Sequence, residues 1–388
     1  MMNDATNEPC IDAPRTDTAC TDAPRATLRT AAQLAAHGLI SGDTLDDIET
    51  VSRKYAIAVS PQMYRLMKPS DRTDLTVADP SIAHPTVADP IAAQFIPTAA
   101  ELMTSSDELE DPIADDAHSP TPGIVHRYPD RVLLKPVHVC AVYCRFCFRR
   151  EMVGPGSESL DEADMDKALE YIASRPEIWE VVITGGDPLI LSPRRLRAIM
   201  QRLDAIPHVG VVRFHSRVPV AKPEAVTQEL LDALKINKAV YIVLHTNHVR
   251  ELSDEARLAC AKFIDSGFPM LSQTVLLRGV NAHAKILEQL FRALVAMRIK
   301  PYYLHHGDLA KGTQHFRTSI AAGQRLMREL RGTVSGLCQP TYVLDIPGGH
   351  GKVPIGPEYL RQREDGAYRV EDYQGESHTY RDSVDNAD

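Results

Sequence analysis

The chain has 388 residues, of which 44% are hydrophobic and 24% are charged, as is ordinary for a globular protein of one large domain or two smaller ones. Its formal net charge of -9 argues against a broad nucleic-acid-binding surface, so we expect a small-molecule partner and no nucleic acid. The sequence has no apolar run of the about 18 residues that a membrane span needs, and its N-terminus lacks the apolar segment of a secretory signal. We therefore expect no membrane contact and a reducing cytoplasm.

Residues 1–30 are rich in Thr, Asp, Ala and Pro and contain the related stretches CIDAPR and CTDAPR. Such a composition offers little apolar surface to bury, so we predict a disordered tail, and we assign no function to its Cys10 and Cys20. Residues 31–120 follow as a predicted helical N-terminal region with loops, because apolar residues recur there at short helical spacings.

From Val132 onward, six β-rich runs alternate with amphipathic stretches of helical length: VLLKPV, EVVITGG, VGVVRFHS, AVYIVLHT, PMLSQTVLLRG and KPYYLHHGD. This alternation predicts parallel βαβ units, hence an α/β fold with an open or closed barrel. Helix starts are indicated at Ser159, Ser192, Ser253 and Asn281.

Unusual polar residues follow the predicted strands. A cysteine-rich loop follows the first strand, and further polar groups end the second, third, fourth and sixth: Gly185-Gly186-Asp187, His215-Ser216-Arg217, His245-Thr246-Asn247-His248 and Asp308. Active sites of α/β barrels lie at the carboxyl ends of the strands, so we predict one site there.

The cysteine-rich loop reads CAVYCRFCFRR and places Cys140, Cys144 and Cys147 as C-x3-C-x2-C. The seven cysteines of the chain are too few and too unevenly spaced for a disulfide framework. A structural zinc ion wants four ligands, and His138 or Cys338 are the available fourth ligands. An iron-sulfur cluster is normally held by four thiolates, so three cysteines leave one iron open to an exogenous ligand.

This spacing, with aromatic residues beside the cysteines, resembles the radical S-adenosylmethionine superfamily. The resemblance implies a partial (β/α)6-type barrel over residues 121–350 and a [4Fe-4S] cluster bound by Cys140, Cys144 and Cys147. It also implies that S-adenosyl-L-methionine chelates the open iron and yields a 5′-deoxyadenosyl radical. The segment Gly185-Gly186-Asp187 is similar to the glycine-rich element that meets the methionine amino group; a strand-ending turn is the alternative interpretation.

The sequence further resembles the lysine 2,3-aminomutases from about residue 40 to residue 375. Seven motifs occur in the expected order: VHRYPDRVLL, YCRFCFRR, ITGGDPL, QTVLLRGVN, KPYYL, GTQHFRT and PGGHGKVP. The resemblance implies pyridoxal 5′-phosphate as an additional cofactor, bound as a Schiff base by Lys352 within a C-terminal segment, residues 351–388, that completes its site.

The same resemblance assigns the remaining site residues. Arg127, Tyr128 and Arg131 are implied to anchor the cofactor phosphate, for which guanidinium forks are suited. Ser216, Arg217, His245, Asn247 and Gln273 match the positions around S-adenosylmethionine. Arg149 matches the residue that pairs with the substrate α-carboxylate, whereas Arg145 and Arg150 receive no role.

Asp308 and Asp345 match two carboxylates that the lysine enzymes use for the substrate ε-ammonium, and retention of both favours a cationic side chain. The implied reaction is 2,3-migration of the amino group of L-lysine to give β-lysine, initiated when the radical removes hydrogen from Cβ. A reductant such as flavodoxin or ferredoxin is implied, and homo-oligomerisation stays open.

Two departures from the family pattern leave alternatives. His305-His306-Gly307 alters the wall beside Asp308, and no cysteine follows Cys338, so we expect no C-terminal zinc site. The alternative functions are an aminomutase for a lysine of a translation elongation factor or for another cationic amino acid such as arginine, and a noncatalytic metal-binding protein on the same scaffold.

Overall fold

The computed structural model describes residues 23–67, 89–154 and 159–383. Most of the predicted disordered tail, including Cys10 and Cys20, lies outside the described residues. The division of the chain after residues 30, 120 and 350 stays a prediction.

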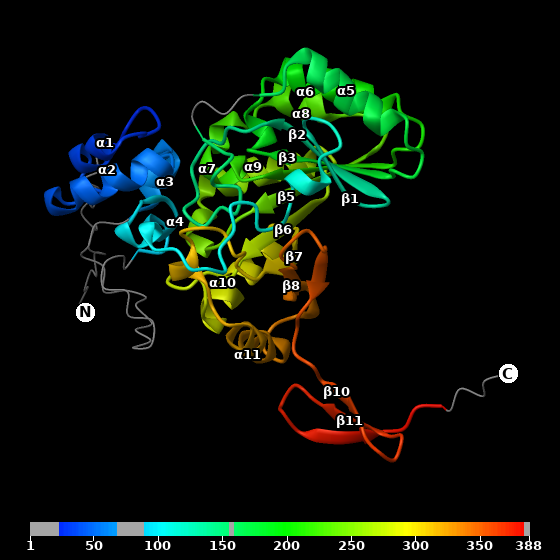
Figure 1. The fold of residues 1–388 in the computed structure, drawn as a ribbon. Coiled ribbons are helices and arrows are strands. Elements are labelled where there is room, and N and C mark those ends of the chain that lie inside the picture. Colours follow the sequence, from blue (N-terminus) through cyan, green and yellow to red (C-terminus); the bar gives the residue numbers. More distant parts are fainter. Residues whose placement is uncertain (1–22, 68–88, 155–158, 384–388) are drawn as a thin grey trace, which may run out of the picture.

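A nine-stranded sheet curls into a half-barrel at the centre of the molecule, with its strands in chain order (Figure 1). Strands β2 to β8 run parallel, and β1 and β9 add antiparallel edges. The strands are β1 Ile124–Tyr128, β2 Arg131–Val137, β3 Glu180–Gly185, β4 Val211–Ser216, β5 Ala239–His245, β6 Met270–Val275, β7 Ile299–His305, β8 Thr341–Asp345 and β9 Lys352–Pro354. The six predicted runs are β2 to β7, so the predicted α/β barrel class is confirmed.

The sheet is larger than the sequence predicted. A seventh parallel strand, β8, pairs with β7, and β9 folds back on β8 so that Lys352 opens a strand. Our prediction of six strands was therefore incomplete. The pairing of Asp345 with Lys352 in the β8–β9 register brings these two residues, seven apart in sequence, side by side.

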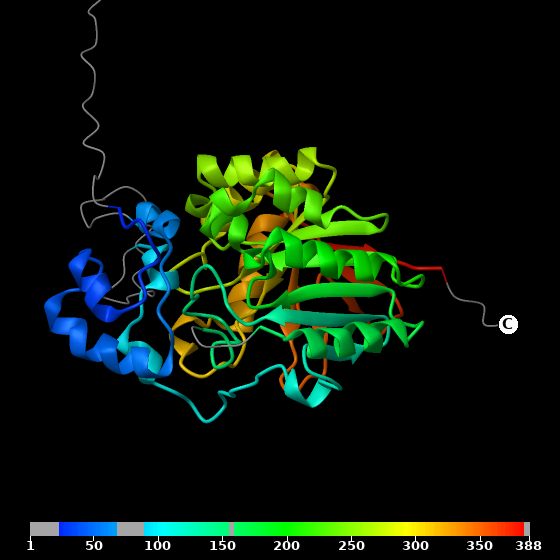
Figure 2. The same cartoon turned by 90° about the horizontal axis from the view of Figure 1, so that it is seen from above.

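Helices cover the outer face of the half-barrel (Figures 1 and 2). They are α5 Glu162–Ala173, α6 Pro193–Asp204, the short α7 Val218–Ala221, α8 Gln228–Leu234, α9 Asp254–Asp265, α10 Ala284–Ala296 and α11 Ile320–Arg331. Their apolar faces pack with the strands into the main core. Parallel strands covered in this way are apolar over most of their length, which explains runs such as EVVIT.

Two of the four predicted helix starts are confirmed. Ser192 and Ser253 cap α6 and α9 by accepting hydrogen bonds from backbone N–H groups three residues ahead. The predicted starts at Ser159 and Asn281 were wrong, because Asp161 caps α5 and His283 caps α10. Asn281 instead donates to the carbonyls of Asn247 and Val275, and so joins two strand ends.

The N-terminal helices lie beyond the carboxyl ends of the parallel strands (Figure 2). They are α1 Ala31–Ala36, α2 Leu45–Lys54, α3 Pro61–Leu66 and α4 Ala92–Phe95, and they share a small apolar core. The Ser60 hydroxyl, which caps α3, donates to the Ala221 carbonyl after β4 at 2.6 Å. This region therefore roofs the end of the barrel at which the site was predicted.

The chain ends in a separate antiparallel sheet of β10 Leu360–Gln362, β11 Tyr368–Glu371 and β12 Ser377–Tyr380. This small sheet projects from the body of the molecule (Figure 1). In the described part of the chain, no helix combines the length and the apolar character that crossing a bilayer requires.

Candidate active site

One cavity of about 500 Å³ lies inside the half-barrel and reaches its carboxyl end. All the residues that the family resemblance assigned to the site line this cavity, whereas Thr246 and His248 do not. The assigned residues are Arg127, Tyr128, Arg131, Cys140, Cys144, Cys147, Arg149, Gly185, Gly186, Asp187, Ser216, Arg217, His245, Asn247, Gln273, Asp308, Asp345 and Lys352. The fold thus brings together residues more than 200 positions apart.

The glycine turn after β3 lies directly against the start of the cysteine loop. A Cβ at Gly186 would stand 2.3 Å from the carbonyl oxygen of Val139, and one at Gly185 would stand 2.5 Å from that of Val137. Gly185 also has a φ of 107°, which side chains rarely adopt. Both glycines are therefore needed for the two backbones to meet.

The three cysteines of the loop form a donor set for iron. Burial raises the pKa of the Cys144 thiol to about 12 and also raises the pKa values of Cys140 and Cys147. Thiolates at these positions consequently need a cation bound to them, as an iron-sulfur cluster provides. Among the described residues, no three His, Cys, Asp or Glu side chains are close enough together to bind one metal ion. The spacing of the three cysteines therefore fits a cluster of several irons better than a single ion.

Arg145 and Arg150, the two unassigned arginines, hold the cysteine loop in place. Both are fully buried and pair with the carboxylate of Glu101, which follows the N-terminal helices. Arg145 also donates to the Ala56 carbonyl at 2.6 Å, and Arg150 donates to the Gly312 carbonyl at 2.9 Å. Neither arginine lines the cavity, so their contacts give them a structural role.

Asp187 joins the ends of β3 and β4. Its carboxylate accepts from the Ser216 hydroxyl at 2.7 Å and from the backbone N–H groups of Arg217 and Val218 at 2.7 and 3.0 Å. Burial raises its pKa in spite of these hydrogen bonds. This residue therefore shapes the wall on which Ser216 and Arg217 lie.

The sequence did not indicate Glu251 and Gln94, which position Arg217 and Asn247. Arg217 donates to Glu251 at 2.5 Å and to Gln94 at 2.7 Å. The side-chain amide of Asn247 donates to Gln94, and its backbone N–H donates to Glu251. Gln94 comes from α4 of the roof, so the N-terminal region completes this wall.

His245 stands at the end of β5 as a neutral imidazole. Burial, with the nearby charge of Arg217, lowers its pKa to about 3. Its ring packs edge-on against His215 with centroids 5.3 Å apart, and Gln273 on β6 is its register partner. These polar, uncharged groups suit contact with a neutral ring or hydroxyl groups.

Lys352 lies at the edge of the cavity in a compact cluster of polar groups. Its ammonium pairs with the Asp345 carboxylate and lies 3.4 Å from the Nδ1 of His305. Burial by itself would raise the pKa of Asp345, but the hydrogen bond from His305 and the charge of Lys352 hold that pKa below its usual range. The backbone N–H of Lys352 donates to the Tyr128 hydroxyl at 2.7 Å.

Asp308 is the second carboxylate of this wall. Burial raises its pKa to about 7, and the adjacent negative charge of Asp345 acts in the same direction. The positive charges of Lys352 and Arg149 reach it and oppose the shift. A ligand cation placed at this carboxylate would remove the cost of ionising it.

Cations gather on another part of the cavity wall, around the buried carboxylate of Asp115. Arg149 donates from Nε to Asp115 at 2.8 Å, and Arg127 and Lys135 lie 3.4 and 3.7 Å from the same group. The Nε of Arg127 is buried without a hydrogen-bond partner in the described part of the chain. Arg131 stacks over the Tyr128 ring at 3.8 Å. This wall fits the anionic groups of a phosphate or a carboxylate.

Comparison with known proteins identifies the family. Residues 134–290 match the model of the Radical SAM superfamily, and residues 327–387 match the model named Lysine-2,3-aminomutase. The first segment contains the cysteine loop and most of the strand ends, and the second contains Asp345 and Lys352.

Three curated proteins show how far the similarity extends. The L-lysine 2,3-aminomutase of Clostridium subterminale is 39% identical over 84% of this chain and 75% of its own. That of Fusobacterium nucleatum is 42% identical over 75% of this chain and 68% of its own, and the glutamate 2,3-aminomutase of Clostridioides difficile is 36% identical over 81% and 70%. From its matched segments and its identity to these enzymes, the chain belongs to the lysine 2,3-aminomutase family, whose members are radical S-adenosylmethionine isomerases with a [4Fe-4S] cluster.

Proposed function

We propose that the protein moves the amino group of L-lysine from C2 to C3 and so produces β-lysine, with pyridoxal 5′-phosphate as a cofactor. The observation that carries this proposal is the charge pattern of the cavity inside the half-barrel. Two carboxylates, Asp308 and Asp345, and a group of cations around Asp115 line the same space. An amino acid with an α-carboxylate and a distal ammonium complements both.

Each wall residue has a role in this proposal. Arg149 holds the α-carboxylate, and Asp308 with Asp345 neutralises the distal ammonium. Arg127, Tyr128 and Arg131 hold the cofactor phosphate, and Lys352 bonds to the cofactor aldehyde. The groups around Ser216, Arg217, His245, Asn247 and Gln273 hold S-adenosylmethionine on the cluster of Cys140, Cys144 and Cys147. When bound, these cofactors supply the radical that removes hydrogen from Cβ and the electron sink that stabilises it.

Glutamate is disfavoured as the substrate by the same charges. Its side-chain carboxylate would face Asp308 and Asp345 and would repel both. Free arginine or a protein-bound lysine would satisfy the carboxylates, so the substrate must be tested directly. Free thiols persist in a reducing environment, and we place the activity in the cytoplasm.

An anaerobic assay tests the proposal. The protein is reconstituted with iron and sulfide and incubated with pyridoxal phosphate, S-adenosylmethionine, a reductant and L-lysine, and mass spectrometry follows deoxyadenosine and β-lysine. We expect both products. Absence of both from fully reconstituted protein would refute the function, and turnover of arginine alone would refute the substrate.

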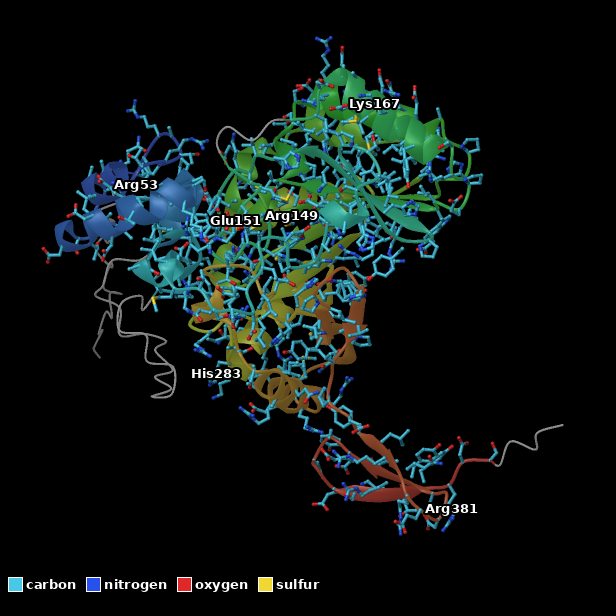
Figure 3. All side chains as sticks on the ribbon, viewed as in Figure 1. Arg53, Arg149, Glu151, Lys167, His283 and Arg381 are labelled. Atoms are coloured by element: carbon cyan, nitrogen blue, oxygen red, sulfur yellow. The ribbon has the colours of Figure 1, made fainter. Side chains whose placement is uncertain are left out.

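Lys352→Ala tests the cofactor assignment separately. We expect loss of the visible absorption of bound pyridoxal phosphate and unchanged iron and sulfide content. Lys167→Ala is the control, because Lys167 lies on the outer surface of α5, away from the cavity (Figure 3). An absorption band that persists in Lys352→Ala shows that another group binds the cofactor.

A further inference from the structure

Asp115 is buried, with 1% of its side chain exposed, yet it contacts three cations that come from three places in the chain. Arg127 lies on β1, Lys135 lies on β2, and Arg149 lies at the end of the cysteine loop. Two of the three, Arg127 and Arg149, line the cavity. The carboxylate therefore stands behind the cation wall and contacts the two arginines from the protein side.

The geometry leaves the arginines partly free to bind a ligand. Arg149 donates to Asp115 from Nε at 2.8 Å, and its two Nη groups make no hydrogen bond to that carboxylate. One negative charge meets three positive charges in these contacts. The excess positive charge stands where we place the substrate carboxylate and the cofactor phosphate.

The segment that carries Asp115 also contacts the loop before Lys352. Ala114 adopts a φ of 51°, which is uncommon for a residue with a side chain. The N–H of Gly348 donates to the Pro112 carbonyl at 3.2 Å. At Gly349, with a φ of 82°, a Cβ would stand 2.6 Å from the His118 ring. Residues 111–118 are thus fixed between the lysine loop and the arginines.

We propose that Asp115 is a positioning residue for substrate recognition: it fixes the guanidinium of Arg149 next to the phosphate-binding Arg127, so that the substrate α-carboxylate meets donors of Arg149 in a fixed orientation. This inference rests on the proposed function and extends it to a residue that touches neither substrate nor cofactor. Because Asp115 acts through Arg149, its loss should weaken the binding only of ligands that carry the α-carboxylate.

Two ligands separate positioning from general structure. L-Lysine and 1,5-diaminopentane share an amine for the cofactor and a distal ammonium, but only lysine has the α-carboxylate. Their binding to the pyridoxal phosphate-loaded protein is followed by visible absorption, without S-adenosylmethionine or reductant, so that no turnover occurs. For Asp115→Asn we expect the Kd of lysine to rise about ten- to a hundredfold, as for loss of an oriented charged hydrogen bond, with the Kd of diaminopentane little changed.

Matched variants make the test specific. Glu108→Gln removes another buried carboxylate of the same region, whose partner Arg317 lies outside the cavity lining, and should leave both Kd values unchanged. Adding Asp115→Asn to Arg149→Ala should produce no further loss for lysine, because the two residues act as one unit. If Asp115→Asn does not fold, Asp115→Asn with Lys135→Met removes one charge of each sign and should show the same selective loss.

The outcomes are distinguishable. An equal loss for both ligands, or no loss, in Asp115→Asn overturns the positioning role while the proposed function stands. A wild-type protein that does not prefer lysine to diaminopentane overturns the role of Arg149 and the inference with it. A wild-type protein without a pyridoxal phosphate band contradicts the proposed function itself.

Discussion

Two buried carboxylates hold neighbouring arginines of one loop for opposite purposes. Glu101 pairs with Arg145 and Arg150, which also donate to backbone carbonyls away from the cavity; among the described residues the Nε of Arg150 has no hydrogen-bond partner. Asp115 pairs with Arg149, which lines the cavity. The first network is closed within the protein, and the second is open toward a ligand.

The difference appears between consecutive residues. The side chain of Arg150 is 0% exposed and that of Arg149 is 12% exposed, although their local sequence is the same. Figure 3 shows Arg149 in the middle of the molecule, between the N-terminal helices and the barrel. An arginine serves structure or recognition according to whether its guanidinium group faces the interior of the fold or the cavity, and the residue type alone does not reveal which.

Removing the closed network should have the largest effect. Glu101→Gln leaves two buried guanidinium groups without a counter-charge, and we expect the free energy of unfolding to fall by about 3–5 kcal/mol. Urea denaturation of the apoprotein measures this loss, and cluster content after reconstitution should fall with it. Glu110→Gln, which removes an exposed partner of Lys311, should change neither quantity. A Glu101→Gln protein as stable as wild type would show that the loop is held by other contacts.

A pair of conservative substitutions should separate the two networks. Arg150→Lys cannot reproduce the fork to Glu101 and Gly312, so it should lower the free energy of unfolding by about 1.5–3 kcal/mol without altering the KM for lysine. Arg149→Lys should raise that KM about tenfold or more with less effect on stability. Denaturation curves and steady-state kinetics on both proteins measure the two effects. If both variants changed the free energy of unfolding and the KM for lysine in the same way, Arg149 and Arg150 would not have the different roles that we assign to them.

The open site should also respond to pH through Asp308. Its pKa of about 7 means that the carboxyl is largely neutral below pH 7 and charged above it. The substrate ammonium prefers the charged form, so the affinity for lysine should rise as the pH rises through about 7, by up to about tenfold per pH unit below that value. In Asp308→Asn the affinity should be weak and should lack this rise. A wild-type affinity that falls over the same interval would contradict the assignment.

The contact between residues 111–118 and the lysine loop should give the smallest effect. Gly349→Ala combines a positive φ with a clash against His118, whereas Gly279→Ala meets the φ cost alone, because a Cβ there has no neighbour within 4 Å. Each substitution should lower the free energy of unfolding by about 1–2 kcal/mol, because an alanine is strained at a positive φ. Gly349→Ala should in addition weaken pyridoxal phosphate binding, which a fluorescence titration measures. If the two variants bind pyridoxal phosphate equally well, the contact between Gly349 and His118 does not contribute to the cofactor site.

The sequence predicted the strand ends well and the supporting residues poorly. The six strands follow from local alternation, which is a property of short segments, whereas the cavity-lining residues that we named follow from the resemblance to the family's motifs. Strand β8 was missed because TYVLD is short and its partner β7 lies elsewhere in the sequence. Glu101, Asp115, Gln94 and Glu251 were missed for a related reason, since an isolated acid or amide carries no local sign of the arginine it will meet.

The roof of the barrel has a consequence for how the protein is made. Gln94 reaches Glu251 across 157 residues, and Ser60 reaches Ala221 across 161. Contacts of such long sequence separation form late, since the intervening chain must first be ordered. During synthesis the three cysteines leave the ribosome before the strands that enclose them. We therefore expect cluster insertion to follow completion of the barrel, and nascent chains truncated before β5 to retain no iron.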